Sequence, residues 1–251
     1  MRVLVCVKRV PAPGARIVLT DDGQRIDTSL LSFTVSPHEE CAVEAAVQIA
    51  EETDGSVTVL TLGPPEAEEQ LRAALAVGAH EAVLVPTDGS DWDPISTATA
   101  IAETISELED GERFDLILFG NESADSGGYQ VGIRVAHALG RPVVSGIKGI
   151  ELGDGSARLR RDTPTGSEIY DLPLPAVVAV KEGINLPRYP TLKGRLNAKK
   201  VEVQVVERDR VGSGQAMVRL TTPAQEASQT TILPDAAAVV DVLEELQVLG
   251  S

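Results

Sequence analysis

Short apolar runs and helical patterns alternate through the first half of the chain, and this alternation limits the possible folds more than any other feature. Strands are predicted at residues 2–7, 56–62, 80–85 and 114–119, and helices at 38–52, 65–78 and 94–109. Strands that are apolar on both faces and joined by helices form a parallel sheet covered by those helices. The sequence therefore predicts a doubly wound, mostly parallel, Rossmann-like α/β fold.

A different pattern follows residue 125. A helix is predicted at 129–139 and an extended strand at 143–150; short strands with tight turns are then predicted at 156–162, 167–170 and 176–180. Short strands joined by tight turns indicate an antiparallel extension of one sheet edge. A further hairpin, at residues 10–32, is predicted as a peripheral insertion after the first strand.

Charge and composition exclude several function classes. The net charge of −16 opposes binding to nucleic acid and to anionic membranes, because both are polyanions. No stretch approaches the roughly 20 apolar residues of a membrane helix, and the start of the chain reads as a strand and not as a signal peptide. We therefore expect a cytoplasmic protein with no membrane insertion. Cys6 and Cys41 are the only cysteines, so neither a disulfide framework nor a metal site is predicted.

Residues 184–206, here named the docking segment, carry a net charge of +4, whereas the other 228 residues sum to −20. The five cations of the segment are Arg188, Lys193, Arg195, Lys199 and Lys200, and its apolar residues include Leu186, Tyr189 and Leu192. Two prolines and Gly194 oppose a helix or central strand in its first half. Apolar residues inside a charged rim predict a protein-docking surface. The alternative is that Leu192 packs on this chain's own sheet and the charges keep an edge soluble.

Four segments are expected to converge at the carboxyl ends of the parallel strands, where doubly wound sheets bind ligands. They are residues 6–8, 36–39, 62–64 and 120–132. The last reads GNESADSGGYQVG and places Ser126, Gly127 and Gly128 at the predicted start of a helix, where backbone N–H groups favour a phosphate. An ordinary capped turn is the alternative.

No catalytic residues are predicted. The chain has no GxxxxGK[ST] loop and no GxGxxG after the first strand, and no nucleophile is recognisable beside a base. The SGG at 126–128 resembles part of the loop of ATP pyrophosphatases, but it follows the wrong strand and lacks the next two residues of that motif. An adenylating enzyme is accordingly the weakest alternative.

Five stretches together resemble the β subunit of electron-transfer flavoprotein, the family that includes FixA: VLVCVKRVPAP, SPHEECAVEAAV, TLGPPEAEEQLRAALAVGA, DLILFGNESADSGGYQVG and LPAVVAVKEGINLPRYPTLKGRLNAKK. The resemblance implies an adenine-nucleotide-hydrolase-like core in a heterodimer with an α subunit, which mainly holds a redox-active FAD. It also implies electron transfer from flavin dehydrogenases, such as acyl-CoA dehydrogenases, to a quinone-linked oxidoreductase, without autonomous catalysis.

In the ordinary branch of this family the β pocket holds AMP, and in the electron-bifurcating branch it holds a second FAD. The resemblance assigns cofactor binding to Cys6, Ser36, Pro37, His38, Glu39, Leu62, Gly120, Asn121, Glu122, Ser123, Ala124, Asp125, Ser126, Gly127, Gly128, Tyr129, Gln130 and Val131. Ser36 stands where the family often has Asn, and Glu39 where some members have a small neutral residue. A carboxylate there would repel a phosphate unless it is turned outward.

Partner docking is assigned to Pro187, Arg188, Tyr189, Leu192, Lys193, Arg195, Lys199 and Lys200, with Leu192 as the apolar anchor. We expect residues 1–183 to form the nucleotide-binding domain, 184–206 the recognition loop and a following strand, and 207–251 a C-terminal arm. The arm joins a polar stretch, 207–231, to a helix at 234–248 that is predicted to pack on the α subunit. A stand-alone adenine-nucleotide-binding protein of the universal-stress type is the remaining alternative.

Overall fold

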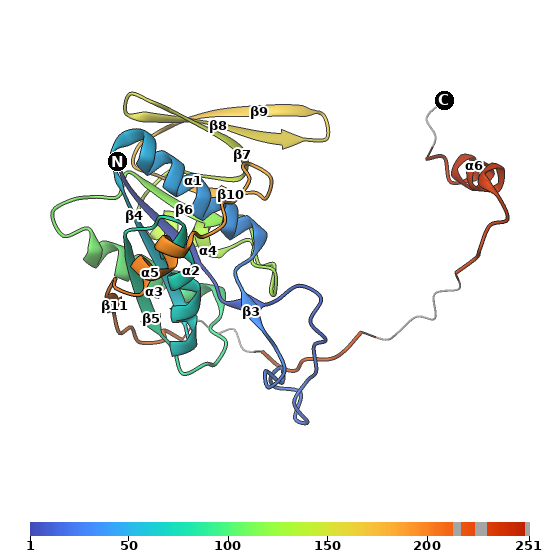
Figure 1. Ribbon diagram of the computed structural model, residues 1–251, viewed down its shortest axis with the longest axis horizontal. Helices are drawn as coiled ribbons and strands as arrows, with labels where there is room; N and C mark the ends of the chain where they lie inside the picture. Colours follow the sequence, from blue (N-terminus) through green and yellow to red (C-terminus); the bar gives the residue numbers. More distant parts are fainter. Residues whose placement is uncertain (213–216, 224–229, 249–251) are drawn as a thin grey trace.

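A nine-stranded mixed sheet forms the centre of the chain in the computed structural model, which describes residues 1–212, 217–223 and 230–248 (Figure 1). The strand order is β11-β5-β4-β1-β6-β10-β7-β8-β9. Its parallel core consists of β1 (Arg2–Val7), β4 (Ser56–Gly63), β5 (Glu81–Pro86), β6 (Leu116–Gly120) and β10 (Ala176–Val180). The chain runs from β1 outward to β4 and β5 on one side and later to β6 on the other, so the order reverses at β1.

Helices cover both faces of this sheet, which confirms the predicted doubly wound architecture. On one face α1 (Pro37–Thr53) and α2 (Glu68–Val77, preceded by the 3-10 turn Pro65–Ala67) pack over Val3 and Val5 of β1. On the other face α3 (Pro94–Leu108) and α4 (Val131–Ala138) pack over Leu4 and Cys6. Successive β1 side chains thus enter opposite cores, as strand geometry requires.

An antiparallel wing extends one edge of the sheet, as predicted. It comprises β7 (Val143–Gly153), β8 (Ser156–Thr163) and β9 (Gly166–Pro173). The prediction that residues 176–180 belong to this wing is wrong, because β10 lies between β6 and β7 and pairs in parallel with both. All five residues of β10 are buried, and an apolar run without alternation is the pattern of a central strand.

The predicted insertion after β1 is confirmed as a peripheral feature. Its base is closed by antiparallel pairing of β2 (Val10–Pro11) with β3 (Phe33–Thr34), and farther out Leu19 and Ile26 form an isolated bridge. Residue Leu220, far along the chain, returns to this insertion and donates its N–H to the Gly23 carbonyl at 2.9 Å.

The docking segment contains a helix that the sequence did not predict. Thr191 caps α5 (Leu192–Ala198), and the segment continues into β11 (Val203–Val205), which pairs in parallel with β5. Both prolines precede the cap and therefore do not interrupt the helix. Gly194 lies within α5, where an added Cβ would come within 2.2 Å of the Ala76 carbonyl oxygen on α2. Because this glycine has no side chain, α5 and α2 can pack closely together.

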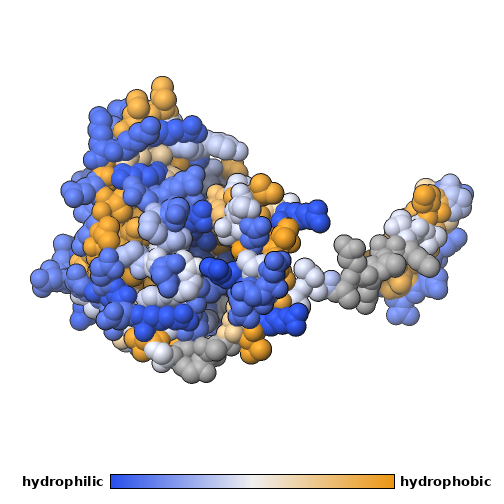
Figure 2. All heavy atoms as spheres, turned by 90° about the horizontal axis from the view of Figure 1, so that it is seen from below, coloured by the Kyte–Doolittle hydropathy of each residue, from blue (hydrophilic) through white to orange (hydrophobic). Residues whose placement is uncertain are grey.

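The last helix, α6 (Ala236–Glu245), has no buried residue and is drawn well apart from the sheet (Figure 1). It lies within the predicted range 234–248 and begins after an Asp235 cap. Figure 2 shows hydrophilic and hydrophobic residues interspersed on the visible face of the main body, and hydrophobic residues among hydrophilic ones on the separate end that carries α6. The exposed apolar residues there include Val239, Val240, Leu246 and Val248. Parts of the predicted polar link, residues 213–216 and 224–229, lie outside the described residues.

Candidate nucleotide-binding site and docking surface

The predicted ligand segments meet at the carboxyl ends of β1 and β6. The Lys8 Nζ that follows β1 lies 2.6 Å from the Asp125 carboxylate in the loop after β6. The Ser36 hydroxyl, at the start of α1, donates to the Glu122 carbonyl in the same loop at 3.3 Å. Leu62 is the second-last residue of the adjacent strand β4, which pairs with β1 up to Val7 and Thr61. This position is the reversal of strand order, where doubly wound sheets bind ligands in a crevice, and it is called the crevice below.

Glu39, in the first turn of α1, is turned inward and is only 6% exposed. It forms a capping box with Ser36: its carboxylate accepts the Ser36 N–H at 3.1 Å, and the Ser36 hydroxyl accepts the Glu39 N–H at 3.4 Å. A Cβ added to Gly120 would lie 2.6 Å from the Glu39 Cγ, so the end of β6 abuts the start of α1. The Glu39 carboxylate therefore does not turn outward, as the sequence analysis required for a phosphate to bind nearby. It is engaged in the capping box instead.

Burial raises the pKa of Glu39 to about 7, although hydrogen bonds from Ser36 and Lys8 oppose this shift. Burial, and the Glu39 carboxylate beside it, also raise the pKa of the Cys6 thiol well above its usual range. Cys6 is 6% exposed and points into the core beneath α3 and α4. Its thiol is thus protonated at neutral pH and inert as a nucleophile. Any contact of Cys6 with a ligand would come from its main chain.

Glu122 connects the loop after β6 to the start of α1. The His38 Nδ1 accepts the Glu182 N–H at 2.8 Å, so the ring proton is on Nε2, which faces the Glu122 carboxylate at 3.2 Å. A hydrogen bond to the same carboxylate raises the pKa of Tyr129. Pro37 occupies the first turn of α1 and fixes the entry of the chain into the helix.

The loop itself differs from its predicted conformation. Its first residue, Asn121, donates its N–H to the Val180 carbonyl at 2.8 Å. Helix α4 begins at Val131, so the prediction that residues 126–128 start a helix is wrong. Tyr129 adopts a left-handed conformation with φ of 54°, which separates the SGG from the helix.

The loop still carries polar groups beside the ends of β1 and β6. The hydroxyls of Ser123 and Ser126 lie 3.0 Å apart. A Cβ on Gly128 would meet nothing within 4 Å, so its backbone is open. Ala124 is exposed, and the Gln130 side chain accepts from Arg134 at 3.0 Å. Lys8 lies in the predicted segment 6–8, but its ion pair with Asp125 was not predicted, because the two residues are 117 positions apart in the sequence.

Tyr129 and Gln130 also border a surface groove of about 480 Å³ between α3 and α4. Its walls are mainly apolar and include Ile95, Ala98 and Ile133. Sequence reasoning missed this groove, because it depends on the packing of two helices whose separation the sequence does not give.

The docking segment presents apolar side chains to solvent. Leu186, Tyr189 and Leu192 are 89%, 93% and 76% exposed. The alternative that Leu192 packs on the chain's own sheet is therefore wrong. Four of the predicted docking cations are exposed around these residues, namely Lys193, Arg195, Lys199 and Lys200. Exposed apolar side chains with a cationic rim match the arrangement expected of a docking surface.

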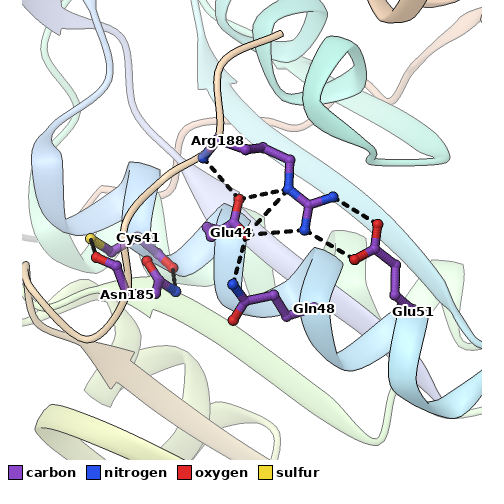
Figure 3. A network of polar contacts seen from close by, with 6 residues as sticks. All are labelled: Cys41, Glu44, Gln48, Glu51, Asn185 and Arg188. Carbon is purple, nitrogen blue, oxygen red and sulfur yellow. Dashed lines mark hydrogen bonds and ion pairs between the residues drawn. The ribbon is translucent and has the colours of Figure 1, made fainter. Parts of the chain in front are cut away.

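Arg188 differs from the other four cations because its guanidinium is bound within the chain (Figure 3). Its Nε lies 2.9 Å from the Glu44 carboxylate, and its Nη1 lies 2.7 Å from the Glu51 carboxylate, both on α1. Hydrogen bonds to Glu51 and Glu44 raise the pKa of Arg188, and the same contact lowers the pKa of Glu51. Contact of Arg188 with a partner stays a prediction. Its positive charge is already paired with two carboxylates of this chain.

Arg72 on α2 holds the far end of α5. Its guanidinium donates to the carbonyls of Ala198 and Val201 at 2.5 Å each and pairs with Glu68 at 2.8 Å. Cations near a helix C-terminus satisfy the last carbonyls. Sequence reasoning did not identify Arg72, because its partners are main-chain atoms more than a hundred residues away.

Both cysteines are buried free thiols. Among residues 1–212, 217–223 and 230–248, no three or more His, Cys, Asp or Glu side chains gather where they could bind a metal ion. Within the same described ranges, no helix has the length and hydropathy needed to cross a bilayer.

Comparison with known proteins gives one consistent result. The family model "Electron transfer flavoprotein domain" matches residues 26–211. The Mycobacterium leprae electron transfer flavoprotein subunit beta is 37% identical over 244 residues, covering 90% of this chain and 91% of the relative. Its Mycobacterium tuberculosis counterpart is 34% identical over 249 residues, covering 97% and 92%.

A further relative is named as a subunit of a reductase-Etf complex. The caffeyl-CoA reductase-Etf complex subunit CarD of Acetobacterium woodii is 32% identical over 214 residues, covering 84% of this chain and 80% of the relative. The family model spans well over half of the chain, and the mycobacterial relatives align along nearly all of it. The chain therefore belongs to the electron transfer flavoprotein family, among its beta subunits.

Proposed function

We propose that this chain is the β half of a heterodimeric electron carrier, which accepts electrons from flavin dehydrogenases and passes them to a quinone-linked oxidoreductase. The observation that carries the proposal is the docking segment, where exposed apolar residues and four exposed cations stand on a protein of net charge −16. An acidic partner with an apolar pocket fits that surface. The chain's own part is to bind and orient, and it has no autonomous catalysis.

The α subunit is proposed to hold the FAD, which when bound supplies a group able to take up and release one or two electrons. Support for an α subunit comes from the names of the relatives and from α6, which has apolar side chains exposed and no buried residue. The C-terminal arm, residues 207–251, would pack on that subunit. Residues 1–183 would form the nucleotide-binding domain and 184–206 the recognition element.

The crevice is proposed to bind an adenosine phosphate. The Lys8 ammonium, the Ser123 and Ser126 hydroxyls and the open backbone at Gly128 are suitable partners for a phosphate. Asp125 already neutralises Lys8, and Glu122 adds a further carboxylate. AMP, the nucleotide of the ordinary branch of the family, is proposed to bind there with its phosphate near these groups.

A second FAD in the crevice is the alternative cofactor, with membership of the electron-bifurcating branch. The observation in its favour is the likeness to a subunit of a caffeyl-CoA reductase-Etf complex. Nucleotide extraction from the purified heterodimer distinguishes the two proposals. One flavin and one AMP per heterodimer supports the first, and two flavins with no AMP supports the second.

Electron uptake tests the carrier function itself. The chain is co-expressed with its α subunit, and the yellow heterodimer is mixed with a reduced acyl-CoA dehydrogenase while flavin absorbance is followed. Bleaching of the heterodimer flavin supports the proposal. A colourless chain that binds ATP tightly without a partner, measured by isothermal titration, would instead identify a stand-alone nucleotide-binding protein of the universal-stress type.

A further inference from the structure

The entry of the docking segment is bonded to one stripe of α1 (Figure 3). The stripe consists of Cys41, Glu44, Gln48 and Glu51, whose spacing of three or four residues places them on one helix face. The Asn185 side chain donates to the Cys41 carbonyl at 3.0 Å. The Arg188 main-chain N–H donates to the Glu44 carboxylate at 3.1 Å, so the backbone of the segment is held as well as its side chain.

The Arg188 guanidinium joins two carboxylates that differ in exposure. The Glu44 side chain is 4% exposed and also accepts from Gln48 at 2.7 Å, whereas the Glu51 side chain is 60% exposed. A carboxylate as deeply buried as Glu44 requires a charged, hydrogen-bonded partner. Buried ion pairs of this kind contribute little net stability but can fix one arrangement of the chain.

The far end of the segment is bonded separately to α2. Arg72 binds the carbonyls of Ala198 and Val201, and Gly194 lies against the Ala76 carbonyl. Between the two attachments stand Leu186, Tyr189, Leu192 and Leu196, which are 52% to 93% exposed. The short stretch of backbone that carries these exposed apolar side chains is thus fixed at both of its ends.

We propose that Arg188, with Glu44 and Glu51, is a positioning clamp that presents the docking segment to its protein partner in a preformed conformation, and that Arg188 does not itself contact the partner. The proposal rests on the docking function proposed above and assigns Arg188 a role different from that of the other four cations. Preorganisation raises affinity because each side chain ordered on binding otherwise lowers it several-fold.

Hydrogen exchange and steady-state kinetics of the heterodimer test the clamp. Two variants remove it: Arg188→Met, and the double variant Glu44→Gln with Arg188→Met, which leaves no buried charge unpaired. A third variant, Glu51→Gln, removes only the exposed ion pair and should have a smaller effect. Arg195→Met is the matched control, because it removes an exposed cation from the same segment and leaves the clamp intact.

In the clamp variants we expect amide exchange of residues 184–196 to accelerate about tenfold or more. The KM for the heterodimer as substrate of the dehydrogenase should rise about tenfold, with kcat at saturation and flavin content unchanged. Arg188→Lys should restore part of both effects, since one of the two ion pairs can re-form. Arg195→Met should raise the KM in a salt-dependent way without changing exchange.

Unchanged exchange of residues 184–196 in the double variant would overturn the clamp. Accelerated exchange with an unchanged KM would overturn it as well, because the loosened segment would then have no bearing on the partner. Failure of the carrier function is recognised separately, as a wild-type heterodimer that takes no electrons from any flavin dehydrogenase. In that case the exchange measurement still decides whether the three residues hold the segment.

Discussion

The Glu39 carboxylate accepts the Ser36 N–H at 3.1 Å beneath the end of β6, where Gly120 leaves no space for a methyl group. This burial raises the pKa of Glu39 to about 7, from about 4.5 in the unfolded chain. The folded protein therefore binds the proton more tightly than the unfolded one, and folding is penalised once the carboxyl ionises.

We expect the free energy of unfolding to fall as pH rises from about 4.5 to about 7, by about 3 kcal/mol from this group. Glu39→Gln keeps the capping box and abolishes that decrease. Urea unfolding of both proteins at pH values from 4.5 to 8 measures the effect. A constant difference between them across this range would contradict the prediction.

The ion pair of Lys8 and Asp125 gives a pair of variants with opposite expected effects. Lys8→Met should weaken AMP binding about tenfold, because the crevice loses its cation and keeps Asp125. Asp125→Asn should strengthen binding several-fold, because Lys8 is released from an ion pair only 2.6 Å long. Isothermal titration at two salt concentrations measures both. Effects of the same sign would show that these charges do not face the phosphate.

Leu192 is the proposed apolar anchor, and Leu192→Ala should slow electron transfer from dehydrogenase to flavoprotein. Burial of a leucine in a partner contributes about 1.5–3 kcal/mol, so a KM increase of roughly tenfold or more is expected. Flavin content should be unchanged, since the side chain is 76% exposed. Leu30→Ala is the control, a residue 95% exposed in the peripheral insertion. An unaltered rate in Leu192→Ala would remove the anchor.

Gly194→Ala should separate α5 from α2, because the new methyl carbon would lie 2.2 Å from the Ala76 carbonyl oxygen. Backbone cannot move aside as a flexible side chain can, and overpacking of this kind costs about 1–3 kcal/mol. Chemical denaturation measures the loss. Gly212→Ala is the matched control, since its Cβ would meet nothing within 4 Å. Equal stability of the two variants would argue against the close contact.

A chain that ends at residue 230 lacks α6 and should keep its fold, because α6 has no buried residue. Its association with the α subunit should weaken, since the exposed valines and leucines of α6 are lost. Thermal unfolding of the truncated chain and the dissociation constant of its heterodimer separate the two effects. Unchanged association would show that the arm packs elsewhere.

The sequence predicted those parts of the fold whose signals are local. Buried strands such as β1 and β6 are continuous apolar runs, and the Ser36-Pro37 start of α1 has its cap and its proline side by side. Adjacency in a parallel sheet then follows from general rules of chain connection. For this reason the meeting of residues 6–8, 36–39 and 120–132 could be predicted, whereas nucleotide binding by them stays a prediction.

Features that depend on distant partners could not be predicted in the same way. The role of Arg188 follows from Glu44, 144 residues away, and that of Gly194 from a carbonyl on α2. The start of α4 was misplaced because Tyr129 adopts a left-handed conformation that residue type does not reveal. Strand β10 was assigned to the antiparallel wing because the two strands before it in the sequence, β8 and β9, form an antiparallel pair. In the sheet it lies between β6 and β7 and pairs in parallel with both.

The solvent-exposed face of α6 has a consequence for the life of the protein in the cell. A newly made copy that finds no companion chain displays these aliphatic side chains to chaperones and proteases, which bind such surfaces. Surplus copies would be removed or would aggregate. On the proposal that α6 packs on the α subunit, this chain would accumulate only when both subunits are made in balance.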